Sequence, residues 1–123
     1  MTSRHKSTAA VAIAAGASLS GAANSGDKLL CAIIMPAIWT AAALTFQASD
    51  DGGVTWNNVY DDQGNEITIA SAAVVAGQRI SMDPSNFAGI DFIKVQSGIV
   101  GALVNQVAAA TLILIYRKYY ALD

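Results

Sequence analysis

The feature that most constrains this chain is a series of short segments in which apolar and polar side chains alternate, separated by turns rich in Asp and Gly. Residues 44–49 alternate strictly, which is the period of a strand with one buried face. Shorter segments of the same kind surround Ile67, Ile80 and Ile93, and the last covers residues 111–119. No segment has the spacing of an amphipathic helix. The pattern predicts an all-β fold, an antiparallel β-sandwich of jelly-roll type with about eight strands.

A tight hairpin is predicted directly after residues 44–49. The sequence there matches the Asp-box pattern Ser-x-Asp-x-Gly-x-Thr-Trp, with Ser49, Asp51, Gly53, Thr55 and Trp56 at the five specified positions. In this pattern the Ser and Asp side chains bond the backbone of the turn, and the Trp packs beneath it. Sialidases carry several copies together with a cluster of arginines, whereas this chain has one copy and three arginines. The motif therefore predicts a structural role for these residues.

Two of the predicted strands, residues 29–35 and 111–116, are apolar on both faces. An antiparallel sandwich covers only one face of each sheet, so such strands need a second cover. The cover is either the N-terminal segment of the chain or a neighbouring subunit. The residues that we expect in this packing are Leu30, Ile34, Ile113 and Ile115.

The N-terminal segment, residues 1–27, is rich in Ala, Ser, Gly and Thr and can bury little apolar area by itself. We therefore expect an extended N-terminal arm over residues 1–27 and a β-sandwich domain over residues 28–123. The arm would order on a partner, with Val11 and Ile13 as its apolar contacts.

Two segments imitate membrane signals. Residues 4–23 have the outline of a secretory signal peptide, but the apolar centre is mostly alanine. Residues 29–46 form a run of eighteen residues without a charge, about the minimum for a membrane-spanning helix. Pro36 lies in the middle of that run, and the alternation after Ala43 has the period of a strand. We expect two buried strands joined by a turn, and no membrane partner.

Charge is sparse. The chain has seven basic and nine acidic residues, a net charge of −2, and only 13% charged residues. Such a charge balance gives no field that attracts a polyanion, so nucleic acid is not expected as a partner. So few charges are also unusual for a free soluble monomer, which suggests that a partner covers part of the surface.

Catalytic and metal-binding residues are also scarce. One histidine, His5, and one cysteine, Cys31, cannot complete a four-ligand zinc site, and a nucleophile would lack its usual base. Five acids occur without an intervening Lys or Arg: Asp50, Asp51, Asp61, Asp62 and Glu66. Their spacing does not fit a calcium loop, so turn residues that face water are favoured over a metal site or a carboxylate pair. We expect no catalytic residue, no metal and no cofactor.

Aromatic side chains leave one binding function open. Five of them could form a platform on which sugar rings stack, although aromatic residues in strands more often belong to the core. They are Trp39, Trp56, Tyr60, Tyr119 and Tyr120.

Several segments between residues 28 and 118 resemble small virion proteins of tailed bacteriophages. The segments are residues 34–40 (Ile-Met-Pro-Ala-Ile-Trp-Thr), 44–49, Asp51-Gly52, Asp83-Pro84, 87–89, 93–95, 104–106 and 112–117. The same layout is also similar to sugar-binding sandwiches of discoidin type.

The phage resemblance implies a jelly-roll decoration (cement) protein that binds the outer surface of a capsid. The implied partners are the major capsid protein and further copies of the chain, with a trimer favoured, and the implied location is the virion. No catalytic residue is implied. The alternative is a carbohydrate-binding β-sandwich module of a phage head fibre or tail, involved in host-surface attachment.

Overall fold

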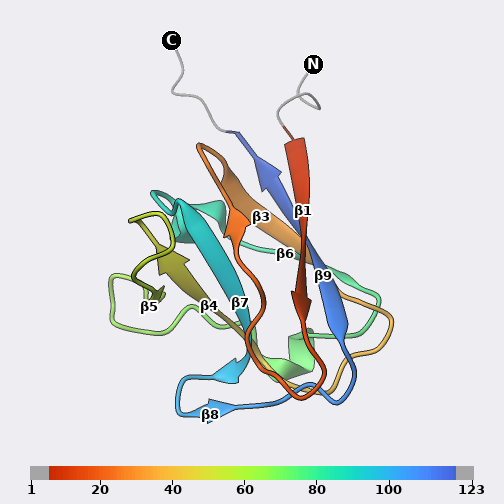
Figure 1. Ribbon diagram of the computed structural model, residues 1–123. Coiled ribbons are helices and arrows are strands. Elements are labelled where there is room, and N and C mark those ends of the chain that lie inside the picture. The colour runs from red at the N-terminus through yellow and green to blue at the C-terminus, as the bar shows by residue number, and fades with distance from the viewer. Residues whose placement is uncertain (1–5, 119–123) are drawn as a thin grey trace.

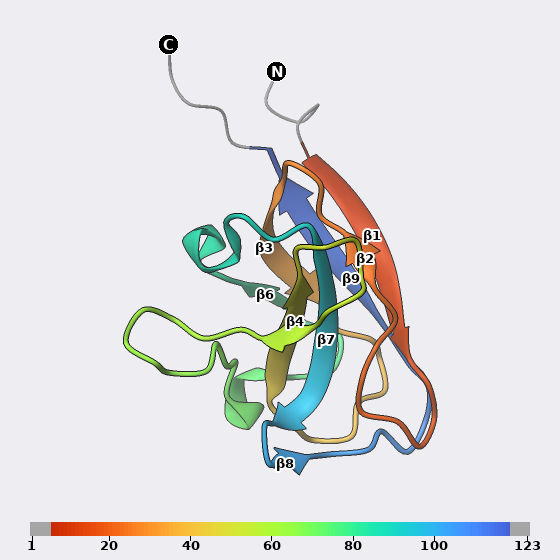
Figure 2. The same cartoon turned by 60° about the vertical axis from the view of Figure 1, so that its left-hand side comes forward.

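The computed structural model describes residues 6–118 as two antiparallel β-sheets packed face to face (Figures 1 and 2). The strands are β1 (Lys6–Ile13), β2 (Ala23–Asn24), β3 (Leu29–Ile34), β4 (Leu44–Ser49), β5 (Asn57–Asn58), β6 (Arg79–Ser81), β7 (Phe92–Ile99), β8 (Ala102–Leu103) and β9 (Ala110–Arg117). Two short 3-10 turns, η2 (Ser71–Ala73) and η3 (Pro84–Phe87), lie in the connections. The described residues contain no α-helix.

The strand order is that of a jelly roll. One sheet has the order β1-β9-β3-β6 and the other the order β2-β7-β4-β5, with β8 beside β7. The first strand thus pairs with the last, β2 with β7, β3 with β6 and β4 with β5, as in a long hairpin wound around itself. The predicted all-β antiparallel sandwich is confirmed.

The N-terminal segment differs from its prediction. Residues 6–27 supply β1 and β2, and β1 pairs with β9 along its whole length, from Lys6 to Ile13. Val11 and Ile13 are buried in the subunit's own core. The physical reason is that Val11 and Ile13 form one apolar face at strand period, and without β1 the apolar strand β9 would lie open at the sheet edge. The expected boundary after residue 27 is therefore absent, and residues 1–5 lie outside the described part.

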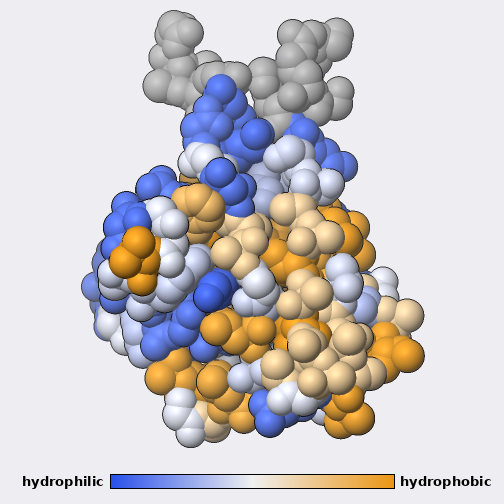
Figure 3. Space-filling view, in the orientation of Figure 1, coloured by the Kyte–Doolittle hydropathy of each residue, from blue (hydrophilic) through white to orange (hydrophobic). Residues whose placement is uncertain are grey.

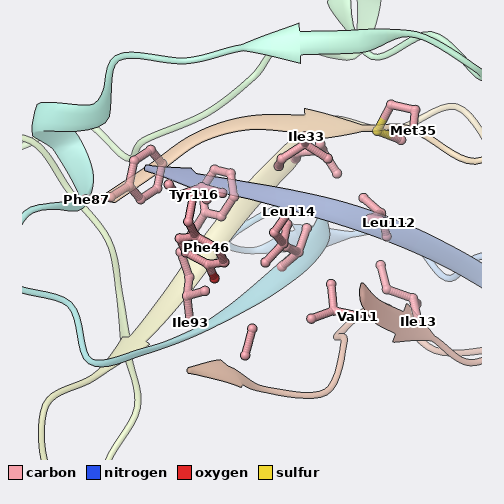
Figure 4. Packing of buried hydrophobic residues seen from close by; sticks show 14 of the residues in the cluster. Val11, Ile13, Ile33, Met35, Phe46, Phe87, Ile93, Leu112, Leu114 and Tyr116 are labelled. Carbon is pink, nitrogen blue, oxygen red and sulfur yellow. The ribbon is translucent and has the colours of Figure 1, made fainter. Parts of the chain in front are cut away.

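The core lies between the two sheets and is filled by aliphatic and aromatic side chains from most strands (Figure 4). Phe46 and Phe87 pack edge to face with ring centroids 5.1 Å apart. Tyr116 is buried, its hydroxyl accepts a 3.4 Å hydrogen bond from Ser25 Oγ, and burial raises the pKa of the phenol. Each such large side chain contributes about 1.5–3 kcal/mol when fully buried, so this layer holds the sheets together.

A β-bulge in β3 decides which of its side chains face the core. Leu30 pairs with Tyr116, but Ala32 pairs with Ile115, so Cys31 is the extra residue. The bulge turns Leu30 into the core, next to Tyr116, whereas strict alternation would place it on the outer face with Ala32 and Ile34. The expectation that Leu30 lies at an interface is corrected for this reason.

The run of eighteen uncharged residues, 29–46, forms β3, a loop and the start of β4. Within residues 6–118, no helix is long and apolar enough to cross a membrane.

The connections between strands gather at two ends of the sandwich, because antiparallel neighbours alternate in direction (Figure 1). One end comprises residues 25–28, 50–56 and 82–91, and we call it the charged end. The other comprises residues 14–22, 35–43, the 70–78 part of the connection between β5 and β6, and 99–109, which contain no Asp, Glu, Lys, Arg or His; the Glu66 carboxylate, from the earlier part of that connection, accepts a hydrogen bond from Val100 N beside them. We call this second end the uncharged end; it lies near β8, at the bottom of Figure 1.

Candidate docking surface

The uncharged end carries most of the large apolar side chains that the fold leaves exposed. Ile38 is 70% exposed and Val107 is 81% exposed. The full set at this end is Ile38, Val75, Ile99, Val100, Leu103 and Val107. Figure 3 shows hydrophobic surface gathered over the lower right part of the molecule in this view. A contiguous apolar patch on a small domain marks an interaction surface.

Backbone hydrogen bonds between distant segments join these loops into one surface. Gly77 N donates to Pro36 O at 2.8 Å, and Gly98 N donates to Ala43 O at 2.8 Å. Gly16 N donates to Gln106 O at 2.7 Å. Each of the four loops is therefore tied to another loop of the same end.

The side chain of Gln106 links segments of the uncharged end through hydrogen bonds. Its side chain is 1% exposed, yet every polar atom of the amide has a partner. Oε1 accepts from Thr40 N at 2.8 Å, while Nε2 donates to Thr40 O at 2.9 Å and to Ser97 Oγ at 2.8 Å. Val107 N donates to Thr40 Oγ1 at 3.1 Å, so the loops that carry Ile38 and Val107 lie side by side. A satisfied buried amide of this kind fixes its surroundings.

Gln106 was not predicted to be a structural or functional residue of this end. The available signal was a pair of amides, Asn105 and Gln106, between apolar and small residues at 102–104 and 107–110, and the sequence does not show which of the two is buried. The partners of Gln106, Thr40 and Ser97, are not adjacent in sequence, so only the fold reveals what it bonds.

The Asp-box residues form the β4–β5 hairpin at the charged end. Ser49 Oγ donates to Asp51 Oδ1 at 2.8 Å and accepts from Gly53 N at 2.9 Å, and Thr55 N donates to Asp51 Oδ1 at 2.8 Å. These bonds, those from Thr55 above all, lower the pKa of Asp51 to about 2. Trp56 Nε1 donates to Gly53 O at 3.0 Å. All five residues hold a turn.

Four of the six predicted interface residues are buried within the subunit. They are Val11, Ile13, Leu30 and Ile115. The first three face the core, and Ile115 lies in β9 between β1 and β3. The interface prediction is corrected for these four because the subunit itself covers them. Ile34, 38% exposed, and the half-buried Ile113 pair on the outer face of the four-stranded sheet, and Ile34 directly precedes the 35–43 loop of the uncharged end.

The acidic residues and the cysteine that were considered as metal ligands or catalytic groups do not form a common site. Glu66 Oε1 accepts from Val100 N at 3.3 Å, and Cys31 Sγ donates to Ile115 O at 3.3 Å. Among residues 6–118, no group of three or more His, Cys, Asp or Glu side chains could hold a metal ion. His5 lies outside the described residues.

A hollow lies between the 59–69 loop and η3. It has a volume of about 360 Å³ and is lined by Tyr60, Asp61, Asp62, Ser85 and Asn86. Asp61 Oδ1 accepts from the backbone N–H groups of Gln63 and Asn65, which fixes the carboxylate.

Tyr60 alone among the described aromatic candidates lines this hollow. Trp39 Nε1 donates to Ala42 O, and Trp56 lies under the ammonium of Lys94, 4.3 Å from the ring centre. Tyr119 and Tyr120 lie outside the described residues.

No protein-family model matches the chain, and no curated protein matches it. The uncharged end is an apolar surface whose loops are joined by hydrogen bonds. Its chemistry suits contact with another macromolecule.

Proposed function

We propose that this chain is a non-enzymatic structural protein of a phage virion. It binds the outer capsid surface as a decoration (cement) protein, docks through the uncharged end and stabilises the shell through subunit contacts. The observation that carries the proposal is that three of the four uncharged segments at one end of the sandwich expose six large apolar side chains. The resemblance to small virion proteins supports the same role.

The uncharged end is complementary in polarity to an apolar surface on a capsid. The four segments carry no charged side chain that could pair with a charged partner, whereas an apolar surface on an assembled shell is relieved of water on contact. The buried Gln106 amide and the bonds between loops order the surface before binding, which reduces the entropy cost of docking. A protein that binds the assembled shell more tightly than free capsid subunits stabilises that shell by mass action.

The test is sedimentation of the purified chain with empty capsids of its parent phage. Val107→Lys places an ammonium in the apolar contact, and we expect at least tenfold weaker occupancy, about 1.4 kcal/mol or more. Val54→Lys is the matched control, because Val54 is 83% exposed and lies at the charged end. Equal occupancy for the two variants would remove the uncharged end as the docking surface.

The second candidate is a carbohydrate-binding module of a phage head fibre or tail. The hollow at Tyr60 favours it, because an exposed aromatic face beside carboxylate and amide groups suits a sugar ring with its hydroxyls. A glycan array with the wild type and Tyr60→Ala separates the two functions. Glycan binding that Tyr60→Ala abolishes, together with no sedimentation on capsids, selects the module over the decoration protein.

A further inference from the structure

The two sheets have four edge strands of very different length. In the five-stranded sheet, β2 and β5 have two residues each, and in the four-stranded sheet β6 has three. The fourth edge, β1, has eight residues and pairs with β9 without a register shift. Natural sheets keep exposed edges short, bulged or rich in charge, because an open edge pairs with other strands. β1 has none of these protections beyond Lys6 at its first position.

The open side of β1 presents unpaired backbone groups. Gly21 N donates to Ala12 O at 3.2 Å, so the backbone of Ala12 faces away from β9. Successive residues of an antiparallel strand direct their N–H and C=O groups to opposite sides, so Thr8 and Ala10 face the same open side as Ala12. No backbone group within residues 6–118 bonds Thr8 or Ala10 there. These four groups are a template for a further strand.

We propose that this edge pairs with the β1 edge of a second copy of the chain, antiparallel and about a two-fold axis. The pairing would join two four-stranded sheets into one continuous sheet. It does not depend on the proposed capsid function.

The lengths of the edge strands indicate that the partner strand at β1 belongs to a second copy of the chain. A ring of subunits needs β1 to meet a different edge of its neighbour, but the other edges of the described residues have only two or three residues. The described edge that matches β1 in length is β1 itself, and contact between identical elements generates a two-fold dimer.

The charge of Lys6 favours an antiparallel arrangement of the two β1 strands. Lys6 is the one charged residue of β1. In a pair centred on Ala9, each Lys6 lies opposite Ala12 of the other copy, so the two ammonium groups are far apart. A parallel pair would place them side by side. The outward side chains of Thr8, Ala10 and Ala12 are small.

The expected dimer is weak in solution. The 20–21 segment covers the edge at Ala12, so a pair centred on Ala9 is limited to about five residues of each strand, 7–11. This contact is smaller than the roughly 800 Å² per partner of a stable interface, so it forms and breaks reversibly. Copies that are held close together on a surface would pair far more completely.

Disulfide trapping of the full-length chain tests the pairing. In a Cys31→Ser background, Ala9→Cys places two thiols opposite each other in a pair without hydrogen bonds, with Cα atoms about 4.5 Å apart, which a disulfide spans. Ala12→Cys in the same background is the control, because its two copies would lie about 20 Å apart along the strands. With oxidised glutathione at high protein concentration, we expect cross-linked dimer from Ala9→Cys to form at least tenfold faster. Equal rates, or no dimer from either variant, overturn the proposal.

Three further substitutions distinguish edge pairing from a folding artefact. Mixed chains that carry Thr8→Cys or Ala10→Cys should form heterodimers faster than homodimers, because Thr8 would lie opposite Ala10 of the second copy. Ala10→Pro removes one open-side N–H and leaves the β9 bonds in place, so it should suppress cross-linking at Ala9→Cys while the melting temperature changes little. Undiminished cross-linking with proline at this position also overturns the proposal.

Discussion

The two ends of the sandwich are held together in different ways. At the charged end, side chains bond the backbone of their own turn: Asp51 accepts from Thr55 N, and Asp83 accepts from Ser85 N at 3.0 Å. At the uncharged end, the bonds join segments that are far apart in the chain, such as Gly16 with Gln106 and Gly77 with Pro36. The first end is a set of self-sufficient turns, and the second is one surface that exists only in the folded protein.

The difference has a consequence for function. A turn whose backbone is bonded by its own Asp side chain is stable without contacts to other loops, and its charged groups remain exposed to solvent. The apolar loops have few polar side chains to close their turns, so a distant partner must hold each loop in place. A substitution at the uncharged end should therefore reach several loops at once, whereas one at the charged end should stay local.

The largest expected loss of stability is that of Gly98→Ala, which disrupts the β7–β8 turn at the uncharged end. Gly98 has φ of +97°, and a Cβ there would lie 2.7 Å from Ala102 O and from Leu103 Cα. Backbone on both sides of the β7–β8 turn must move, so we expect a loss of at least about 3 kcal/mol of unfolding free energy. Urea denaturation measures it.

Gly101→Ala is the matched control in the same turn. Gly101 also has a positive φ, +86°, but no atom lies within 4 Å of the added Cβ. Its cost is that of the backbone conformation, about 1–2 kcal/mol. Equal losses for the two glycines would show that the close approach at Gly98 is not what constrains the turn.

The next effect is that of Gln106→Ala. Truncation leaves Thr40 N, Thr40 O and Ser97 Oγ without their partner, and we expect a loss of about 2–4 kcal/mol in urea denaturation. Hydrogen exchange should also increase at Thr40 and Val107, which lie on two different loops. Asn105→Ala, at the exposed neighbouring position, should change stability by less than about 0.5 kcal/mol. Faster exchange confined to residues 105–107 would contradict the role of Gln106 as the link between loops.

The smallest effect belongs to Asp51 at the charged end, and it depends on pH. The folded pKa of about 2 lies below the ordinary value of 3.8, so the stabilisation is fully present above about pH 4 and is lost as the pH falls toward 2. Asp51→Asn keeps an oxygen acceptor but cannot titrate, so the slope of unfolding free energy between pH 4 and 2 should become shallower.

Asp50→Asn is the control for this slope. Asp50 is exposed and accepts none of the hydrogen bonds of the hairpin, so Asp50→Asn removes a charge from the same turn while leaving those bonds in place, and a change of slope specific to Asp51→Asn is then due to the bonded carboxylate. An identical slope for the wild type and Asp51→Asn would mean that the turn does not depend on this carboxylate.

Much of the fold could be predicted from local patterns. Alternation identified residues 44–49 as a strand, and β4 has those bounds. The predicted hairpin after it is present as β4–β5. Both features depend on interactions within a few residues, which a sequence displays directly.

Non-local features were predicted poorly. Residues 6–13 were predicted as part of an arm because alanine-rich composition suggests little burial, yet β1 completes the sheet beside β9. The bulge at Cys31 reversed the face of Leu30, and alternation alone cannot reveal one extra residue. Gln106 was missed because its partners lie 66 and 9 residues away.

The sequence by itself determined the all-β class, the turns at the charged end and the absence of charge from four segments, residues 14–22, 35–43, 70–78 and 99–109. Only the tertiary structure brought those four segments to one end and left β1 as a long open edge. The reason is physical: a turn is stabilised by neighbours in the chain, whereas a surface or an edge is defined by what the rest of the fold leaves uncovered.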